Sequence, residues 1–253
     1  MTLGKLHETQ THAGPLDHFK KAINFKGDLW GLFEQDYVAD ALTCTCINKF
    51  GASSDTWAAV DAPMYNASSA GETGSNPLTV SHTVQSTYAN RIVIAIVYGQ
   101  EGEVTVRQPT GVTYAGSAMT LLSGLSHSAD VNCSVWYKVN PTTGANDCVA
   151  TLAAPNDNLI MHVADYYFVN QTTPFGTAVQ GAGSGTSASN AVTTTRGDMV
   201  VGGVAHWAYE STAVGAGQTE REDDRRDDGG GDELGGEYSD ERATGTSTTW
   251  SAT

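Results

Sequence analysis

The side chains that could do covalent or metal chemistry are scattered through this 253-residue chain, and no local spacing defines a reaction centre. The sequence has no nucleophile elbow, phosphate-binding glycine loop, His-Glu-x-x-His motif or paired Cys-x-x-Cys. Four histidines, His82, His127, His162 and His206, lie on or beside expected strands, without the clustered spacing of metal ligands. We therefore predict no catalytic residue and expect that the protein is not an enzyme.

A run of acidic residues is the strongest candidate for cation binding. Residues 217–242 hold eleven acids and four arginines with little apolar content, which predicts a solvated loop. Its hard oxygen donors are Asp223, Asp224, Asp227, Asp228, Asp232 and Glu233. Their positions match no known calcium loop, and the arginines would neutralise part of the site. We expect loosely bound calcium, magnesium, sodium or potassium, and no other cofactor.

Aromatic side chains offer a second candidate site. Trp136, Trp207 and Tyr209 could form a platform on which sugars stack, although aromatic residues more often belong to the core or to an interface between subunits.

Two other features of the sequence leave alternatives open. The four cysteines, Cys44, Cys46, Cys133 and Cys148, allow three disulfide pairings, and Asn66, Asn132 and Asn170 each begin an N-glycosylation sequon.

The elements that must carry these residues are predicted to be strands. Hydrophobic residues make up 40% of the chain and charged residues 16%, a composition that argues against a helical bundle. Residues 76–216 contain about ten short segments rich in Val, Thr, Ile and Tyr, separated by Gly, Pro and Asn. We predict an all-β fold, an antiparallel β-sandwich or jelly roll over residues 76–253, with a central strand at RIVIAIVY and a hairpin over residues 131–152.

Residues 1–75 are less regular and are predicted to be an N-terminal arm or a small N-terminal domain. We expect a short helix around Asp28–Asp40 and a linker or long loop from Asn66 to Asn76. Five of the six lysines lie in this region. It could anchor the chain to a partner through residues Lys20, Lys21, Lys26, Leu29, Trp30 and Phe33. The alternative is that this region supplies extra strands of the same domain.

The overall charge limits the classes of partner that the chain could bind. Twenty-eight acids against thirteen Lys and Arg give a formal net charge of -15, which repels phosphate backbones and argues against nucleic-acid binding. An acidic, lysine-poor surface is typical of proteins from salt-loving organisms, although an ordinary acidic protein fits as well. No apolar run approaches the roughly 18–20 residues of a membrane span, so we expect no membrane insertion.

Five motifs, read in order, resemble a known module. GVTYAGSAMTLL, WYKVNPTTGAN, QTTPFGT, GDMVVG and GAGQTER are similar to the repeated signature of a β-sandwich module found in bacterial and archaeal secreted proteins and in virion proteins of tailed viruses. The resemblance covers about residues 78–253 and implies the sandwich fold. The sequence departs from the module in the acidic run after GAGQTER and in its first 75 residues.

The resemblance and the N-terminus together suggest a role. The first residues lack the apolar segment of a signal peptide, which fits a virion protein assembled in the host cytoplasm and later extracellular. We expect a structural virion protein, a capsid decoration, turret, tail or fibre component. It would form homo-oligomers, attach to other virion proteins through its N-terminal region and project the sandwich outward. The alternative is a carbohydrate-binding module that adsorbs to glycans on the host surface.

Overall fold

The computed structural model describes three strands within residues 19–50 and, beyond them, residues 62–100, 108–127, 131–154, 158–229 and 233–253. The described residues form strands, turns and irregular segments without a helix, so none of them makes a helix that could cross a membrane. The chain divides into two compact units, Met1–Val60 and Asp61–Thr253. The prediction of an all-β, antiparallel fold is confirmed.

The first unit contains a small antiparallel sheet. Its strands β1 (Phe19–Phe25), β2 (Asp28–Gln35) and β3 (Cys44–Phe50) pair in the order β1-β2-β3. The helix predicted within Asp28–Asp40 is therefore wrong over residues 28–35. Apolar spacing over so few residues does not separate helix from strand, Gly31 disfavours a helix interior, and β2 gains a hydrogen-bonded neighbour on each side.

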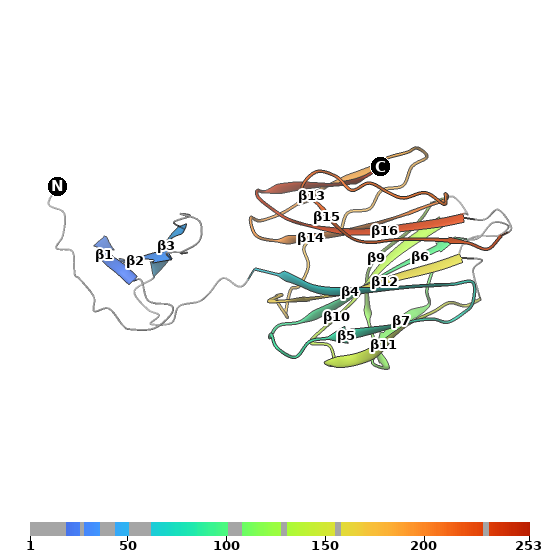
Figure 1. Cartoon of the computed structure of the whole chain (residues 1–253), viewed down its shortest axis with the longest axis horizontal. Coiled ribbons are helices and arrows are strands. Elements are labelled where there is room, and N and C mark those ends of the chain that lie inside the picture. Colours follow the sequence, from blue (N-terminus) through green and yellow to red (C-terminus); the bar gives the residue numbers. More distant parts are fainter. Residues whose placement is uncertain are drawn as a thin grey trace. The chain divides into compact units, whose positions relative to one another are not determined.

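The second unit is a stack of four antiparallel sheets. Figure 1 shows the stack with the four-stranded sheet at the bottom and the two-stranded sheet at the top. The central sheet has the order β4 (Met64–Thr73), β12 (Asn158–Tyr167), β6 (Ile92–Gln100), β10 (Val131–Val139) and β9 (Thr120–His127). On one side lies the four-stranded sheet, β5 (Leu78–Val84), β11 (Gly144–Thr151), β7 (Gly111–Tyr114) and β8 (Ser117–Ala118). On the other lies a three-stranded sheet, here called the acidic sheet, β14 (Met199–His206), β16 (Glu233–Arg242) and β15 (Thr219–Asp227), and beyond it the cover sheet, β13 (Ala188–Thr193) and β17 (Ser247–Ala252).

Three hydrophobic cores separate the four layers. The first lies between the four-stranded and central sheets, the second between the central and acidic sheets, and the third between the acidic and cover sheets. Strand β6 contributes to two of them, because Val93, Ala95 and Val97 face the first core while Ile94 and Ile96 face the second. This two-sided burial explains the continuous apolar run RIVIAIVY and agrees with its predicted central position.

Two adjacent glycines let the acidic sheet approach its neighbours on both faces. A Cβ on Gly203 would lie 2.5 Å from the Tyr98 hydroxyl of the central sheet. On the opposite face, a Cβ on Gly202 would lie 2.5 Å from the indole of Trp250 in the cover sheet. Any larger side chain at either position would push two layers apart, so the Gly-Gly pair in GDMVVGGVAHW sets the spacing of the stack.

The predicted linker at Asn66–Asn76 is wrong. Most of it is β4, an edge strand of the central sheet that pairs with β12, and the units divide after Val60 rather than at residue 75. The segment is poor in the large apolar residues that usually mark a strand. Its small residues fit because a Cβ on Gly71 would lie 2.8 Å from Val80 of the facing sheet.

The predicted acidic loop at residues 217–242 is also wrong, since it contains β15 and β16. Strand β16 is the middle strand of its sheet and is buried from Leu234 to Asp240. Composition misled the prediction because small residues at Gly235 and Gly236 allow close packing, and Arg221 neutralises Asp240 across the sheet. Residues 230–232 lie outside the described residues.

The predicted hairpin over residues 131–152 does not form. Strand β10 pairs with β6 and β9, whereas β11 pairs with β5 and β7, so the segment Asn140–Thr143 passes from one sheet to another. Turn residues mark a reversal of the chain without fixing which edges pair. Cys133 and Cys148 consequently face different cores, and both are free thiols.

Candidate functional site

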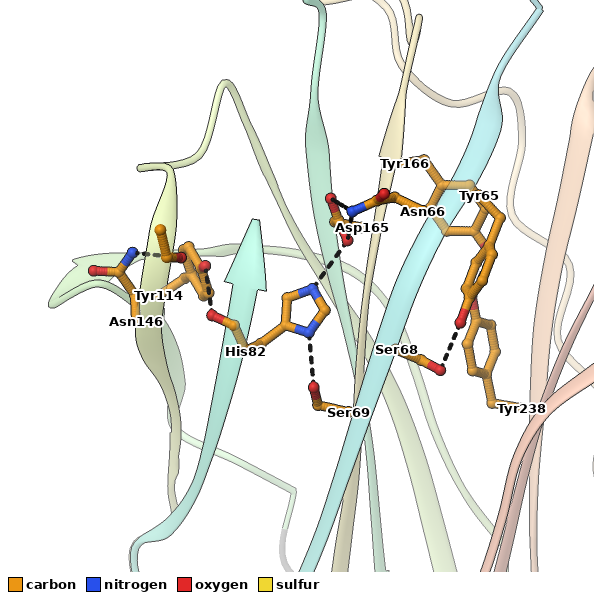
Figure 2. A network of polar contacts seen from close by, with 11 residues as sticks. Tyr65, Asn66, Ser68, Ser69, His82, Tyr114, Asn146, Asp165, Tyr166 and Tyr238 are labelled. Carbon is orange, nitrogen blue, oxygen red and sulfur yellow. Dashed lines mark hydrogen bonds and ion pairs between the residues drawn. The ribbon is translucent and has the colours of Figure 1, made fainter. Parts of the chain in front are cut away.

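A buried histidine and aspartate face each other across the first core. His82 lies on β5 and Asp165 on β12, and their exposed fractions are 2% and 1%. His82 Nε2 is 3.1 Å from Asp165 Oδ1, and His82 Nδ1 is 3.0 Å from the hydroxyl of Ser69 on β4. Figure 2 shows the imidazole between the serine and the carboxylate, with each residue on a different strand.

The surrounding groups complete the hydrogen bonding of this pair. The amide nitrogen of Asn66 donates to both Asp165 oxygens, at 3.1 and 3.0 Å, from a bulge in the pairing of β4 with β12. Tyr114 donates its hydroxyl to the backbone carbonyl of His82 at 3.1 Å. A neutral imidazole with its proton on Nε2 fits all of these contacts, because it donates to Asp165 and accepts from Ser69.

The order serine, histidine, carboxylate is that of nucleophilic hydrolases, so access decides what this cluster can do. His82 and Asp165 occupy inward positions on their strands, where they meet the first core. Ser69 is partly buried on the edge strand β4. Because His82 and Asp165 are both almost fully buried, their hydrogen bond ties the central sheet to the four-stranded sheet.

A second polar cluster connects the central sheet to the acidic sheet. His162 of β12 lies 3.0 Å from Asp224 of β15, and this hydrogen bond lowers the pKa of Asp224. Tyr166 donates to Asp240 at 2.8 Å, while Arg221 binds the same carboxylate through two nitrogens at 3.0 and 2.9 Å. The charge of Asp240 is therefore paired within the buried layer.

A third group of polar residues lies between the acidic and cover sheets. Trp250 of β17 donates its indole N–H to the hydroxyl of Ser239 on β16 at 2.9 Å. Glu237, two residues before Ser239, is fully buried, and its carboxylate oxygens have no close hydrogen-bond partner among the described residues. The pKa of Glu237 is raised to about 7, mainly by burial. The negative charges of Glu220 and Asp223 add to this shift, and Ser239 opposes it.

The structure separates the three aromatic residues predicted to bind sugars. Trp207 is 48% exposed and lines an open hollow of about 870 Å³ beside the cover sheet. Tyr209 is 52% exposed but does not line this hollow, and its backbone N–H donates to Glu233 at 3.0 Å. Trp136 is buried in the first core, where its indole donates to Ser134. Only Trp207 of the three is placed to stack on a ligand in this hollow.

The predicted cation ligands are not brought together. Successive residues of β15 alternate between its faces, so Asp224 pairs with His162 while Asp223 lies 3.2 Å from Arg225. Asp227 accepts the backbone N–H of Gly229 at 2.7 Å. Across the described ranges no three acidic, histidine or cysteine side chains gather to hold a metal ion. Of the other candidates, Glu233 begins β16, Asp228 follows β15, and Asp232 lies outside the described residues.

The predicted anchoring residues lie in the first unit. Lys20 and Lys21 are on β1, and Leu29, Trp30 and Phe33 are on β2, which pairs with β1. Lys26 lies outside the described residues. The two strands thus bring five of the six candidates into one small sheet.

Sequence reasoning missed the cluster around His82 because its members are far apart in the chain. Ser69, His82 and Asp165 come from three strands, and no local motif contains them. A signal was present: in LTVSHTV the histidine takes an inward position among apolar residues, and Asp165 follows a buried run in β12. A polar residue at such a position predicts a buried partner without identifying it.

Searches against protein-family models, curated proteins and solved structures find no match for this chain. The fold and the polar clusters define it as an all-β protein of stacked antiparallel sheets.

Proposed function

We propose that this chain is a structural protein of a virus particle, a decoration, turret, tail or fibre component whose second unit projects outward as a rigid body. The main support is the use made of its buried polar groups. In each core they connect neighbouring sheets, through His82 and Asp165, through Tyr166 and Asp240, and through Trp250 and Ser239. Such ties favour a single rigid arrangement of layers, which suits a scaffold.

The uneven charge supports attachment through the first unit. Residues 1–60 hold five lysines, no arginine and seven acids, a formal charge of -2, which leaves -13 for residues 61–253. An acidic particle would repel the first unit much less than the second. The proposal places the first unit against other virion proteins, with copies repeated by the symmetry of the particle.

Particles purified from producing cells test this role. An antibody against the full chain should label them at regularly repeated positions in electron micrographs, and the chain should co-sediment with them on a density gradient. In competition with the unaltered chain, Lys20→Glu/Lys21→Glu should be incorporated less. Lys138→Glu, a matched charge reversal in the second unit, should be incorporated normally. Recovery of the chain only as free protein, with unlabelled particles, would refute the proposal.

A carbohydrate-binding role is the second candidate, and the exposed indole of Trp207 in the hollow favours it. Glu210, Thr212 and Asn190 line the same hollow as Trp207 and could hydrogen-bond the hydroxyls of a neutral sugar stacked on the indole. On a glycan array the full chain should bind saturably, and Trp207→Ala should abolish that binding. Tyr209→Ala is the matched control, since Tyr209 is equally exposed but lies outside the hollow. A flat array would exclude this role.

A further inference from the structure

The three N-glycosylation sequons lie in different environments. Asn66 is partly buried, and its amide nitrogen, the atom that a transferase would modify, donates to both oxygens of Asp165. Asn132 is 2% exposed on β10, which is hydrogen-bonded to β6 on one side and β9 on the other. Neither amide nitrogen can reach an enzyme unless the central sheet opens.

Asn170 is exposed on a turn just after β12. Its side-chain oxygen accepts the backbone N–H groups of Thr172 and Thr173, at 2.9 and 3.0 Å. These bonds engage the oxygen, and the described residues offer the amide nitrogen no hydrogen-bond partner. The acceptor atom is thus free on the surface of the folded chain, with the sequon threonine two residues away.

The turn is held in place from both sides of Asn170. The backbone N–H of Val169 donates to the carbonyl of Asn90 at 2.9 Å, and the Gln171 side chain donates to the carbonyl of Arg91 at 3.2 Å. After this turn the chain runs without regular structure to β13 at Ala188. An enzyme can therefore bind the sequon without disturbing a strand.

We propose that Asn170 is the acceptor of an N-linked glycan in the folded protein, and that Asn66 and Asn132 are not. The donor is an oligosaccharide joined to a lipid through a pyrophosphate. The Asn170 amide nitrogen forms a bond to C1 of the first sugar as the C1–O bond breaks, the lipid pyrophosphate leaves, and one amide proton passes to a base of the transferase. No group is oxidised or reduced.

The test uses the folded full chain, a purified single-subunit oligosaccharyltransferase and a lipid-linked oligosaccharide. Intact mass and peptide mapping should find one glycan, on Asn170. Asn170→Gln and Thr172→Ala should each lose it completely. Thr173→Ala, which alters the same turn but leaves the sequon intact, should keep it.

Synthetic peptides that span each of the three sequons separate the effect of the sequence from that of the fold. All three peptides should be modified, whereas Asn66 and Asn132 in the folded chain should be modified at least tenfold less than Asn170. An unmodified Asn170 in the folded chain would overturn the proposal, as would modification of Asn66 or Asn132 to more than a tenth of the extent of Asn170.

Discussion

Replacing Glu237 with glutamine should remove a pH-dependent loss in the free energy of unfolding. The residue is fully buried on the middle strand of the acidic sheet, and its carboxylate oxygens have no close hydrogen-bond partner among the described residues. Glutamine keeps the size of the side chain and removes its charge. The substitution therefore isolates the cost of burying a carboxylate at this position.

The size of the effect follows from the pKa. Burial raises the pKa of Glu237 from 4.5 to about 7, so the folded protein holds this proton more tightly than the unfolded chain does. The contribution of this group to stability is greatest below pH 4.5, falls as the pH rises from 4.5 to 7, and stays low above 7. At about 1.4 kcal/mol for each pH unit, the total loss is roughly 3 kcal/mol.

Urea unfolding between pH 4.5 and 8 measures this loss. The free energy of unfolding of Glu237→Gln minus that of the unaltered chain should rise by about 3 kcal/mol from the lowest to the highest pH. Glu72→Gln, on the exposed face of β4, is the matched control and should show no such trend. A difference for Glu237→Gln that is constant with pH would refute the reasoning.

Three other perturbations test the structure. His82→Leu should cost about 1–3 kcal/mol in urea unfolding because it removes one of the hydrogen bonds to the buried Asp165 carboxylate, which keeps those from Asn66, and adding Asp165→Leu should recover part of this; strictly additive losses would contradict the coupling of His82 to Asp165. Burial raises the pKa of Cys148 to about 12, so peptide mapping after iodoacetamide at pH 8 should find Cys148 unmodified in the folded chain and modified in urea, and rapid labelling of Cys148 in the native protein would be inconsistent with its burial. Raising KCl from 0.1 to 2 M should raise the Tm by about 5 °C or more if the charge of -15 is suited to high salt, and an unchanged Tm would argue against a salt-loving source.

Part of the fold could be predicted from local sequence, because burial pattern reports directly on strand position. Alternation in LTVSHTV corresponds to the one inward face of β5, and the unbroken apolar run of β6 corresponds to burial on two faces. The same logic failed for β16, where Gly235, Gly236 and the paired Asp240 replace large apolar side chains. Composition measures how much apolar surface a segment has, whereas burial there depends on close approach and charge pairing.

Pairing between strands was the other limit. The pattern around Pro141 predicts a reversal of the chain. The chain instead passes there from one sheet to another, because β10 pairs with β6 and β11 pairs with β5. The same long-range pairing assembles the His82 cluster, in which His82 and Asp165 are 83 residues apart in the sequence. A sequence pattern shows that a polar residue faces inward, but only the pairing of distant strands determines which partner it meets.

The acidic sheet shows how the charge of this protein is compatible with a layered fold. Asp240 and Asp224 face the central sheet and are each bound there, by Arg221 and by His162. Glu237 faces the cover sheet. There Trp250 donates to Ser239, and no cation among the described residues lowers the pKa of Glu237. The second core therefore pairs these two acids with an arginine and a histidine, whereas Glu237, on the side of the third core, has its pKa raised by burial and is most stable there when protonated. Because the cover sheet has only two strands, it is the layer that ionisation of Glu237 should loosen first.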